Sequence, residues 1–182
     1  MNKTENAQTL DGRAIVESLD REFARLFNNS CEVIVNTPSD SLYAPSQHGG
    51  TTAGTSDLPQ LTSVGERVLR AAAAIEQTFG GITANLWDDP FEWTLPEYLA
   101  TPAKVLAYLT EVEETRKRAF SSFTDDGCLL KQVAVPSGET QPLIDLLTST
   151  LIRAAAYLGQ ETNSLEHSFR DGSHSVYYLD RD

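Results

Sequence analysis

Apolar side chains recur every three or four positions in four stretches of the chain, which is the spacing of one buried helix face. The first helix is expected to begin at Asp11, whose carboxylate can cap free amides, and to end before Thr37-Pro38. The second begins at Thr62 or Ser63, either of which can cap it, and its alanines 71–74 allow close approach of a neighbouring helix. The two stripes are Ile15, Leu19, Phe23, Leu26, Phe27, Cys31 and Ile34, then Val64, Val68, Ala71 or Ala72, Ile75 and Phe79.

The third and fourth helices are predicted from the second half of the chain. Thr101-Pro102 combines a capping residue with proline at the first helical position, and the helix extends to Asp125-Asp126-Gly127. The fourth helix is expected to begin between Thr140 and Pro142 and to end near Phe169. The stripes are Val105, Leu109, Val112, Ala119 and Phe123, then Leu143, Leu147, Leu151, Ala154 and Leu158.

Three segments between these helices lack helical periodicity. Residues 36–61 are rich in proline, glycine and hydroxyl side chains and form a long loop, which is either a lid or a tolerated insertion. Residues 87–101 contain aromatic residues too large to leave in water, Trp87, Phe91 and Trp93, so we expect this crossing to pack across a bundle end. Lys131–Val135 is a short β-like run before a turn.

These elements predict an all-α fold, a four-helix bundle of the up-down-down-up type with one long connection between the first two helices. We expect one domain over residues 11–169, a flexible N-terminus at 1–10 and a tail at 170–182.

Composition narrows the possible functions. The 182 residues are 40% hydrophobic, enough for a core, and their net charge is −12. Such a charge disfavours binding to nucleic acids and to anionic membranes. The sequence has no run of 18 apolar residues and no apolar leader, and two cysteines make no framework, so a cytoplasmic location is expected.

Known chemical motifs are missing from the sequence. His48, His167 and His174 do not share a helix face at the spacing of a metal site. There is no Glu-x-x-His pair of a di-iron bundle, no phosphate-binding loop and no nucleophile elbow. We therefore predict no catalytic residue, no metal site and no cofactor. The acidic side chains of the third helix are expected to form a solvated face, partly neutralised by Arg116, Lys117 and Arg118.

Two helices carry arginines at positions where a binding role is conceivable. Arg67 and Arg70 lie three residues apart on the second helix, and Arg153 and Tyr157 lie four apart on the fourth. Arg153 has small or apolar neighbours and no carboxylate three or four positions away. Such an arginine extends to water, pairs across the bundle or binds an anion.

Three segments resemble the DinB superfamily of damage-inducible four-helix bundles, which is distinct from the DNA polymerase of that name. Thr62–Gln77, TSVGERVLRAAAAIEQ, resembles its second-helix signature. Phe91–Glu113 resembles its crossing and third helix, and Leu146–Leu165 its last helix, with Gly159-Gln160 retained. The resemblance spans most of residues 10–169 and implies a bundle of DinB type.

In these relatives, histidines of the second and last helices hold a divalent metal, and some members are thiol-dependent transferases or isomerases. Residue by residue, those histidines fall on Arg67 and Arg70 and on Arg153 and Tyr157. Charged arginine repels a metal ion, so the resemblance implies a metal-free member.

If these side chains share the cleft of the relatives, the guanidinium groups repel one another and need a counter-charge. That charge comes either from a carboxylate, such as Glu66 or Glu161, or from a small anionic ligand. The resemblance thus points to a ligand site formed by Arg67, Arg70, Arg153 and Tyr157.

Our first functional hypothesis is a non-catalytic bundle that acts by binding or dimerisation, as a homodimer, with a stress-related role implied by the family alone. The alternative is a thiol-dependent S-transferase or isomerase of DinB type that uses other residues. A DNA-repair role would rest only on the family's name, and the charge of −12 speaks against it.

Overall fold

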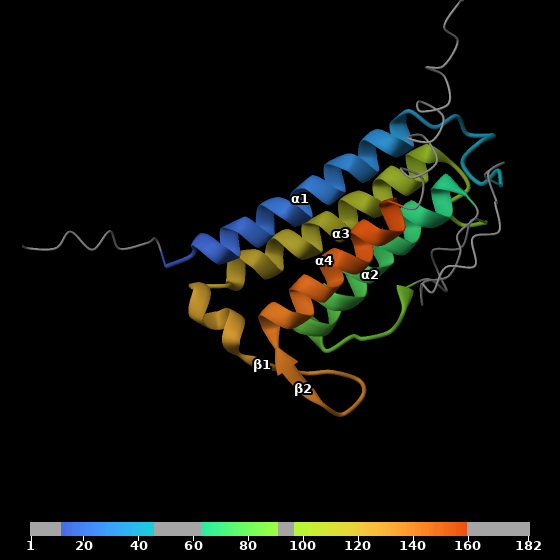
Figure 1. The fold of residues 1–182 in the computed structure, drawn as a ribbon. Coiled ribbons are helices and arrows are strands. Elements are labelled where there is room, and N and C mark those ends of the chain that lie inside the picture. The colour runs from blue at the N-terminus through green and yellow to red at the C-terminus, as the bar shows by residue number, and fades with distance from the viewer. Residues whose placement is uncertain (1–11, 46–62, 91–96, 160–182) are drawn as a thin grey trace, which may run out of the picture.

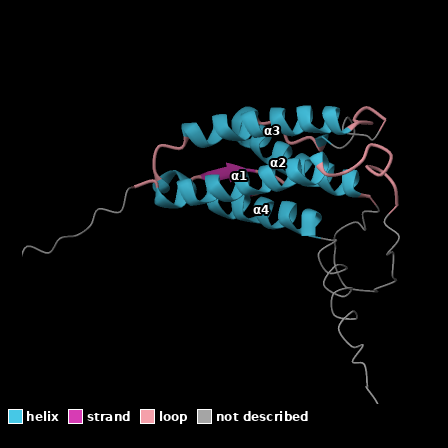
Figure 2. Ribbon diagram, turned by 90° about the horizontal axis from the view of Figure 1, so that it is seen from above, coloured by secondary structure: helices cyan, strands magenta, loops and turns pink. Residues whose placement is uncertain are grey.

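The structure of the chain, a computed structural model, describes residues 12–45, 63–90 and 97–159. Its elements are α1 (Ala14–Val35), α2 (Val64–Ala84), α3 (Pro102–Ser122), the 3-10 helix η2 (Asp126–Leu130), β1 (Gln132–Ala134), β2 (Thr140–Pro142) and α4 (Leu143–Gly159). The four α-helices pack along their lengths in one bundle (Figure 1, and from above in Figure 2), which confirms the predicted all-α bundle. None of the helices in the described ranges is long and apolar enough to span a bilayer.

The helices run up, down, down and up, in the predicted order (Figure 1). α1 ends where α2 begins, because the amide of Gly65 donates to the carbonyl of Leu42 at 2.8 Å. α3 begins at the same end, where the hydroxyl of Tyr43 donates to the carbonyl of Leu99 at 2.7 Å. α2 and α3 are therefore parallel, and α4 returns in the direction of α1.

The connection between α2 and α3 joins opposite ends of the bundle, since these two helices are parallel. The expectation that it packs across one end is wrong, because the chain must return along a helix of about 30 Å. It makes a second long connection besides the one between α1 and α2. Its first residues follow α2, with Asp89 3.4 Å from Arg70. Phe91 and Trp93 lie outside the described residues.

The start of α1 is capped from a distant part of the chain. The N-cap residue is Arg13, which makes no side-chain cap, so the expected cap at Asp11 is wrong. The carboxylate of Asp126 accepts instead from the amides of Ile15 and Val16, at 3.0 and 2.9 Å. The buried stripe shifts accordingly, because Val16 is fully buried while Ile15 is 52% exposed.

The predicted caps of α2 and α3 are confirmed. Ser63 forms a capping box, in which its hydroxyl accepts from the amide of Glu66 and its own amide donates to the Glu66 carboxylate. Thr101 accepts from the amide of Lys104, and Pro102 is the first residue of α3. These local hydrogen bonds satisfy amides that have no partner within the helix.

A short antiparallel hairpin precedes α4. β1 pairs with β2 in a register that places Val133 opposite Gln141, which confirms the predicted β-like run. Gly138, at φ 84°, reverses the chain between the strands. The helix predicted to start near residues 140–142 begins one residue later, at Leu143, because pairing with β1 holds residues 140–142 extended. The expected helix end near Phe169 lies outside the described residues.

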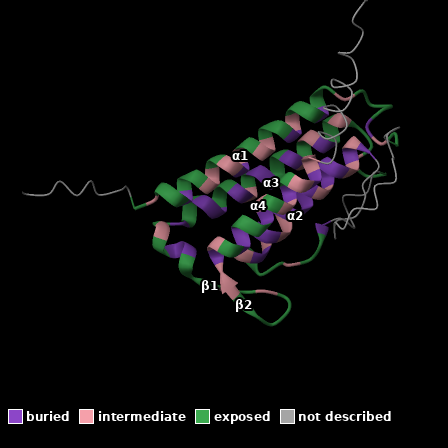
Figure 3. Cartoon of the chain, in the orientation of Figure 1, coloured by how far each residue is buried: buried purple, intermediate pink, exposed green. Residues whose placement is uncertain are grey.

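The core fills the space between the four helices, where the buried positions of each helix face inward (Figure 3). Its centre is a group of aromatic rings from α1, α2 and the end of α3, with ring centroids 5.2–5.8 Å apart. Alanines 71–74 are all buried, so α2 packs closely on α3 and α4, as predicted. The rings belong to Phe23, Phe79, Phe120 and Phe123.

Candidate functional site

A pocket of about 280 Å³ lies between α2, α4, the start of the α2–α3 connection and the hairpin. Its buried floor includes Leu146 and Thr150 of α4. The hairpin contributes Val135 and Pro136 from the turn side, and Trp87 comes from the connection. The pocket thus gathers residues that are up to 76 positions apart in the sequence.

A buried hydroxyl pair fixes the two helices beneath the pocket. The hydroxyls of Thr78 on α2 and Thr150 on α4 are 2.7 Å apart, and each residue is 2% exposed. Thr150 also donates to the carbonyl of Leu146 at 2.9 Å, so Thr78 donates to Thr150. Because an unsatisfied buried hydroxyl is costly, this pair favours one register of α2 against α4.

Trp87 is held as a wall of the pocket by contacts with α2. The side-chain amide of Gln77 donates to the Trp87 carbonyl at 2.9 Å, and the Trp87 indole donates to Asn85 at 3.2 Å. The indole ring lies directly on Gly81, where an added Cβ would come within 2.3 Å of it. Asn85 closes α2 in the left-handed conformation, at φ 55°, which turns the chain back along the helix.

Gly81→Ala is expected to destabilise the protein by about 1–3 kcal/mol, the usual range for overpacking. In an unobstructed helix the same change would be stabilising by about 1 kcal/mol, so the sign reports the contact with Trp87. Urea unfolding measures the stability, and indole fluorescence in a Trp93→Phe background measures the displacement of Trp87. Gly80→Ala is the control, since its Cβ would meet no ring and would approach Leu86 alone, at 3.2 Å from the carbonyl oxygen and 3.9 Å from the Cβ. A Gly81→Ala protein at least as stable as the parent would contradict the contact.

Arg153 is the only charged side chain that lines the pocket among the described residues. Its Nε is buried and has no hydrogen-bond partner within the described ranges. A guanidinium carries five N–H donors and stays protonated, and a buried donor without an acceptor costs free energy. An anion in the pocket would satisfy both the donor and the charge.

The other three residues of the predicted site do not line this pocket. Arg70 pairs with Asp89, Arg67 is 5% exposed, and Tyr157 is part of the apolar core. Since Thr78 faces Thr150 on antiparallel helices, Arg153 is level with about position 75, and Arg70 lies about 7 Å further along α2.

Two carboxylates are candidate counter-charges for the arginines of the predicted site. Glu66 belongs to the capping box of α2, and Glu161 lies outside the described residues. Only Arg153 of the predicted four therefore faces the pocket. No motif in the sequence pointed to Trp87 or Gln77 as site residues, although two consecutive glycines in a helix indicate that a bulky neighbour packs there.

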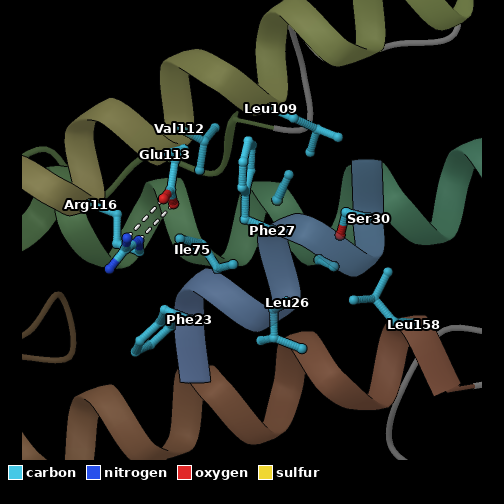
Figure 4. Close-up of a pocket in the computed structure, with 12 residues that line it drawn as sticks. Phe23, Leu26, Phe27, Ser30, Ile75, Leu109, Val112, Glu113, Arg116 and Leu158 are labelled. Atoms are coloured by element: carbon cyan, nitrogen blue, oxygen red, sulfur yellow. Dashed lines mark hydrogen bonds and ion pairs between the residues drawn. The ribbon is translucent and has the colours of Figure 1, made fainter. Parts of the chain in front are cut away.

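A second, smaller cavity of about 20 Å³ lies between the helices of the bundle and has room for about one water molecule (Figure 4). Its wall carries a buried ion pair from α3, in which Arg116 donates to both carboxylate oxygens of Glu113, at 2.7 and 2.8 Å. Arg116 also donates to the carboxylate of Asp20 on α1. Burial lowers the pKa of Arg116, but these carboxylates outweigh it and raise the pKa overall.

This ion pair corrects the expected solvated face of α3. Glu113 is 5% and Arg116 2% exposed, whereas Glu111 and Glu114 are exposed as predicted. The bidentate geometry neutralises both charges, which is the condition under which an ion pair is tolerated in a core.

A phenol–carboxylate pair joins α2 to α3. The hydroxyl of Tyr108 donates to Glu76 at 2.5 Å. Burial raises the pKa of both groups, and the hydrogen bond from Tyr108 lowers the pKa of Glu76 in part. Because both partners are satisfied, we interpret this pair as structural.

The metal site implied by the resemblance does not fit the side chains found here. Its positions carry Arg67, Arg70, Arg153 and Tyr157, which are three cations and a phenol rather than neutral imidazoles. Within residues 12–45, 63–90 and 97–159, no three His, Cys, Asp or Glu side chains are grouped so that they could hold a metal ion. Compared with known proteins, the chain matches no family model, no curated protein and no solved structure.

Proposed function

We propose that this protein is a metal-free bundle of DinB type that works by binding a small anionic ligand in the pocket between α2 and α4. The proposal rests on the buried Nε of Arg153, which lies on the pocket wall and has no hydrogen-bond partner in the described part of the chain. The resemblance contributes Arg153 alone to this location, since the other three positions matched to metal ligands of the relatives, Arg67, Arg70 and Tyr157, do not line the pocket. Binding is favoured over catalysis because the lining residues that the structure describes combine one cation with hydroxyl and amide groups and include no nucleophile–base pair.

Three parts of the broader hypothesis stay predictions. They are the homodimer, the cytoplasmic location and the stress-related role, which follow from the sequence and the resemblance. The thiol-dependent transferase is the alternative activity, and none of the pocket contacts described above favours it.

The proposal predicts saturable binding of a small anion that depends on Arg153. Calorimetry at low ionic strength, with acetate and inorganic phosphate as probes, is expected to give one site per chain. Arg153→Gln keeps a polar side chain of three carbons but removes the guanidinium fork and its charge, and should weaken binding at least tenfold.

Arg25→Gln is the matched control, because Arg25 is 69% exposed, lies on α1 and pairs with Glu22. This variant should bind as the parent protein does, and circular dichroism should show unchanged helix content for both variants. The proposal fails if no probe gives saturable binding, or if Arg153→Gln binds as well as the parent.

A further inference from the structure

The charge of the pocket limits the charge of its ligand. Arg153 is the only cation among the described lining residues, and Arg70 is held by Asp89 outside the pocket. One guanidinium neutralises one negative charge. A second charge on the ligand would be partly buried without a partner, in a chain whose net charge is already −12. The pocket therefore favours a monoanion over a dianion.

The hydroxyl groups of the pocket cannot replace Arg153 as donors to the ligand. Ser149 and Thr150 both donate to the carbonyl of Leu146, each at 2.9 Å, and Thr78 donates to Thr150. The amide of Gln77 is likewise engaged with the Trp87 carbonyl. Gln141 also lines the pocket and its side-chain amide can donate, but it carries no charge. The anionic end of a ligand is therefore directed to the charged guanidinium of Arg153 with its buried Nε–H, whose flat fork matches the two oxygens of a carboxylate.

The rest of the pocket is suited to a flat apolar body. The half-buried indole of Trp87 comes from the α2–α3 connection, and Val135 and Pro136 come from the hairpin turn. Leu146 of α4 lies in the floor. Aromatic and apolar walls with one charged group are typical of small-molecule sites. The volume of about 280 Å³ is close to the lower end of the usual range, so the ligand is small.

We infer that the ligand of this pocket is a small aromatic monocarboxylate, with its carboxylate on Arg153 and its ring against Trp87 and the hairpin turn. The inference rests on the proposed function and adds to it the class of the ligand. The carboxylate supplies the single charge and the ring fills the apolar part, so neither feature alone gives full affinity.

Four probes separate these contributions: benzoate, acetate, inorganic phosphate and the neutral benzyl alcohol. Calorimetry with the full chain is expected to show benzoate binding at least tenfold more tightly than each of the other three. Benzoate should also change the Trp87 emission in the Trp93→Phe background.

Two variants test the two halves of the site. Arg153→Gln should lower the affinity for benzoate at least tenfold, to the affinity that benzyl alcohol has. Val135→Ser should weaken benzoate several-fold and leave acetate unchanged, and it avoids the risk that a change at Trp87 disturbs α2. Circular dichroism and urea unfolding check that both variants are folded.

The possible failures are distinguishable. Phosphate or acetate binding as tightly as benzoate, with dependence on Arg153, would overturn the inferred ligand class and leave the proposed anion site in place. Benzyl alcohol binding as tightly as benzoate would overturn the inferred role of the carboxylate. If none of the probes binds, both the inference and the proposed function are overturned.

Discussion

Arg116→Met is expected to lower the free energy of unfolding by about 3–5 kcal/mol, the range for removing one partner of a buried ion pair. The side chain of Arg116 is 3% exposed and that of Glu113 is 6% exposed. Methionine fills most of the space but provides no donors, so the Glu113 carboxylate stays in the core without its bidentate partner. Urea unfolding followed by circular dichroism measures the loss.

Two further variants show whether the loss comes from the pairing. Lys117→Met should cost less than about 1 kcal/mol, because Lys117 approaches the same carboxylate at 3.4 Å but is 65% exposed. Glu113→Leu combined with Arg116→Met should be more stable than Arg116→Met alone, since no charge is then left in the core. A double variant less stable than Arg116→Met would contradict this explanation.

Phe79→Ala is expected to cost about 3–5 kcal/mol, the range for truncating a buried aromatic residue. Phe79 is fully buried, and its ring centroid lies 5.2 Å from that of Phe23 and 5.6 Å from that of Phe120. The three rings come from α2, α1 and α3, so truncation leaves a cavity at the junction of three helices. Thermal and urea unfolding measure the change.

Phe79→Leu serves as the control, because it keeps most of the apolar volume and should cost clearly less than Phe79→Ala. Both variants should keep the helical circular dichroism spectrum at low temperature. Equal stability of Phe79→Ala and the parent protein would mean that the ring does not occupy the centre of the core.

The parts of the fold that could be predicted are those with local signals. The caps at Ser63 and Thr101 depend on residues three positions away, and the apolar stripes depend on positions three and four apart. Both signals lie within one helix, so the sequence alone displays them. The up-down-down-up order followed from the same elements.

The errors involve partners far apart in the sequence. Asp126 caps α1 across about 110 residues, and β2 is extended because β1 lies beside it. Glu113 and Arg116, three residues apart on a helix, have the spacing of an ordinary surface pair. Their burial depends on how α3 packs against α1, which a local pattern does not contain.

The candidate site was predicted in part. Arg153 was singled out from the sequence because its neighbours are small or apolar, and the structure places it on a pocket wall. Its placement in one cleft with Arg67, Arg70 and Tyr157 came from the resemblance, and these three residues do not line the pocket. Trp87 was missed as a wall because it lies about 60 residues before the part of α4 that it approaches. The hairpin turn was missed because pairing of β1 with β2 places it beside α4.

Nuclear magnetic resonance of arginine Nε–H groups shows whether the buried Nε–H of Arg153 binds an anion. In a titration with benzoate, the Arg153 signal, assigned by its loss in Arg153→Gln, is expected to shift and saturate with the dissociation constant found by calorimetry. The Arg25 signal should stay in place, because that side chain is exposed and is not part of the pocket lining. An Arg153 signal that does not move, or that moves without saturation as the Arg25 signal does, would contradict anion binding at Arg153.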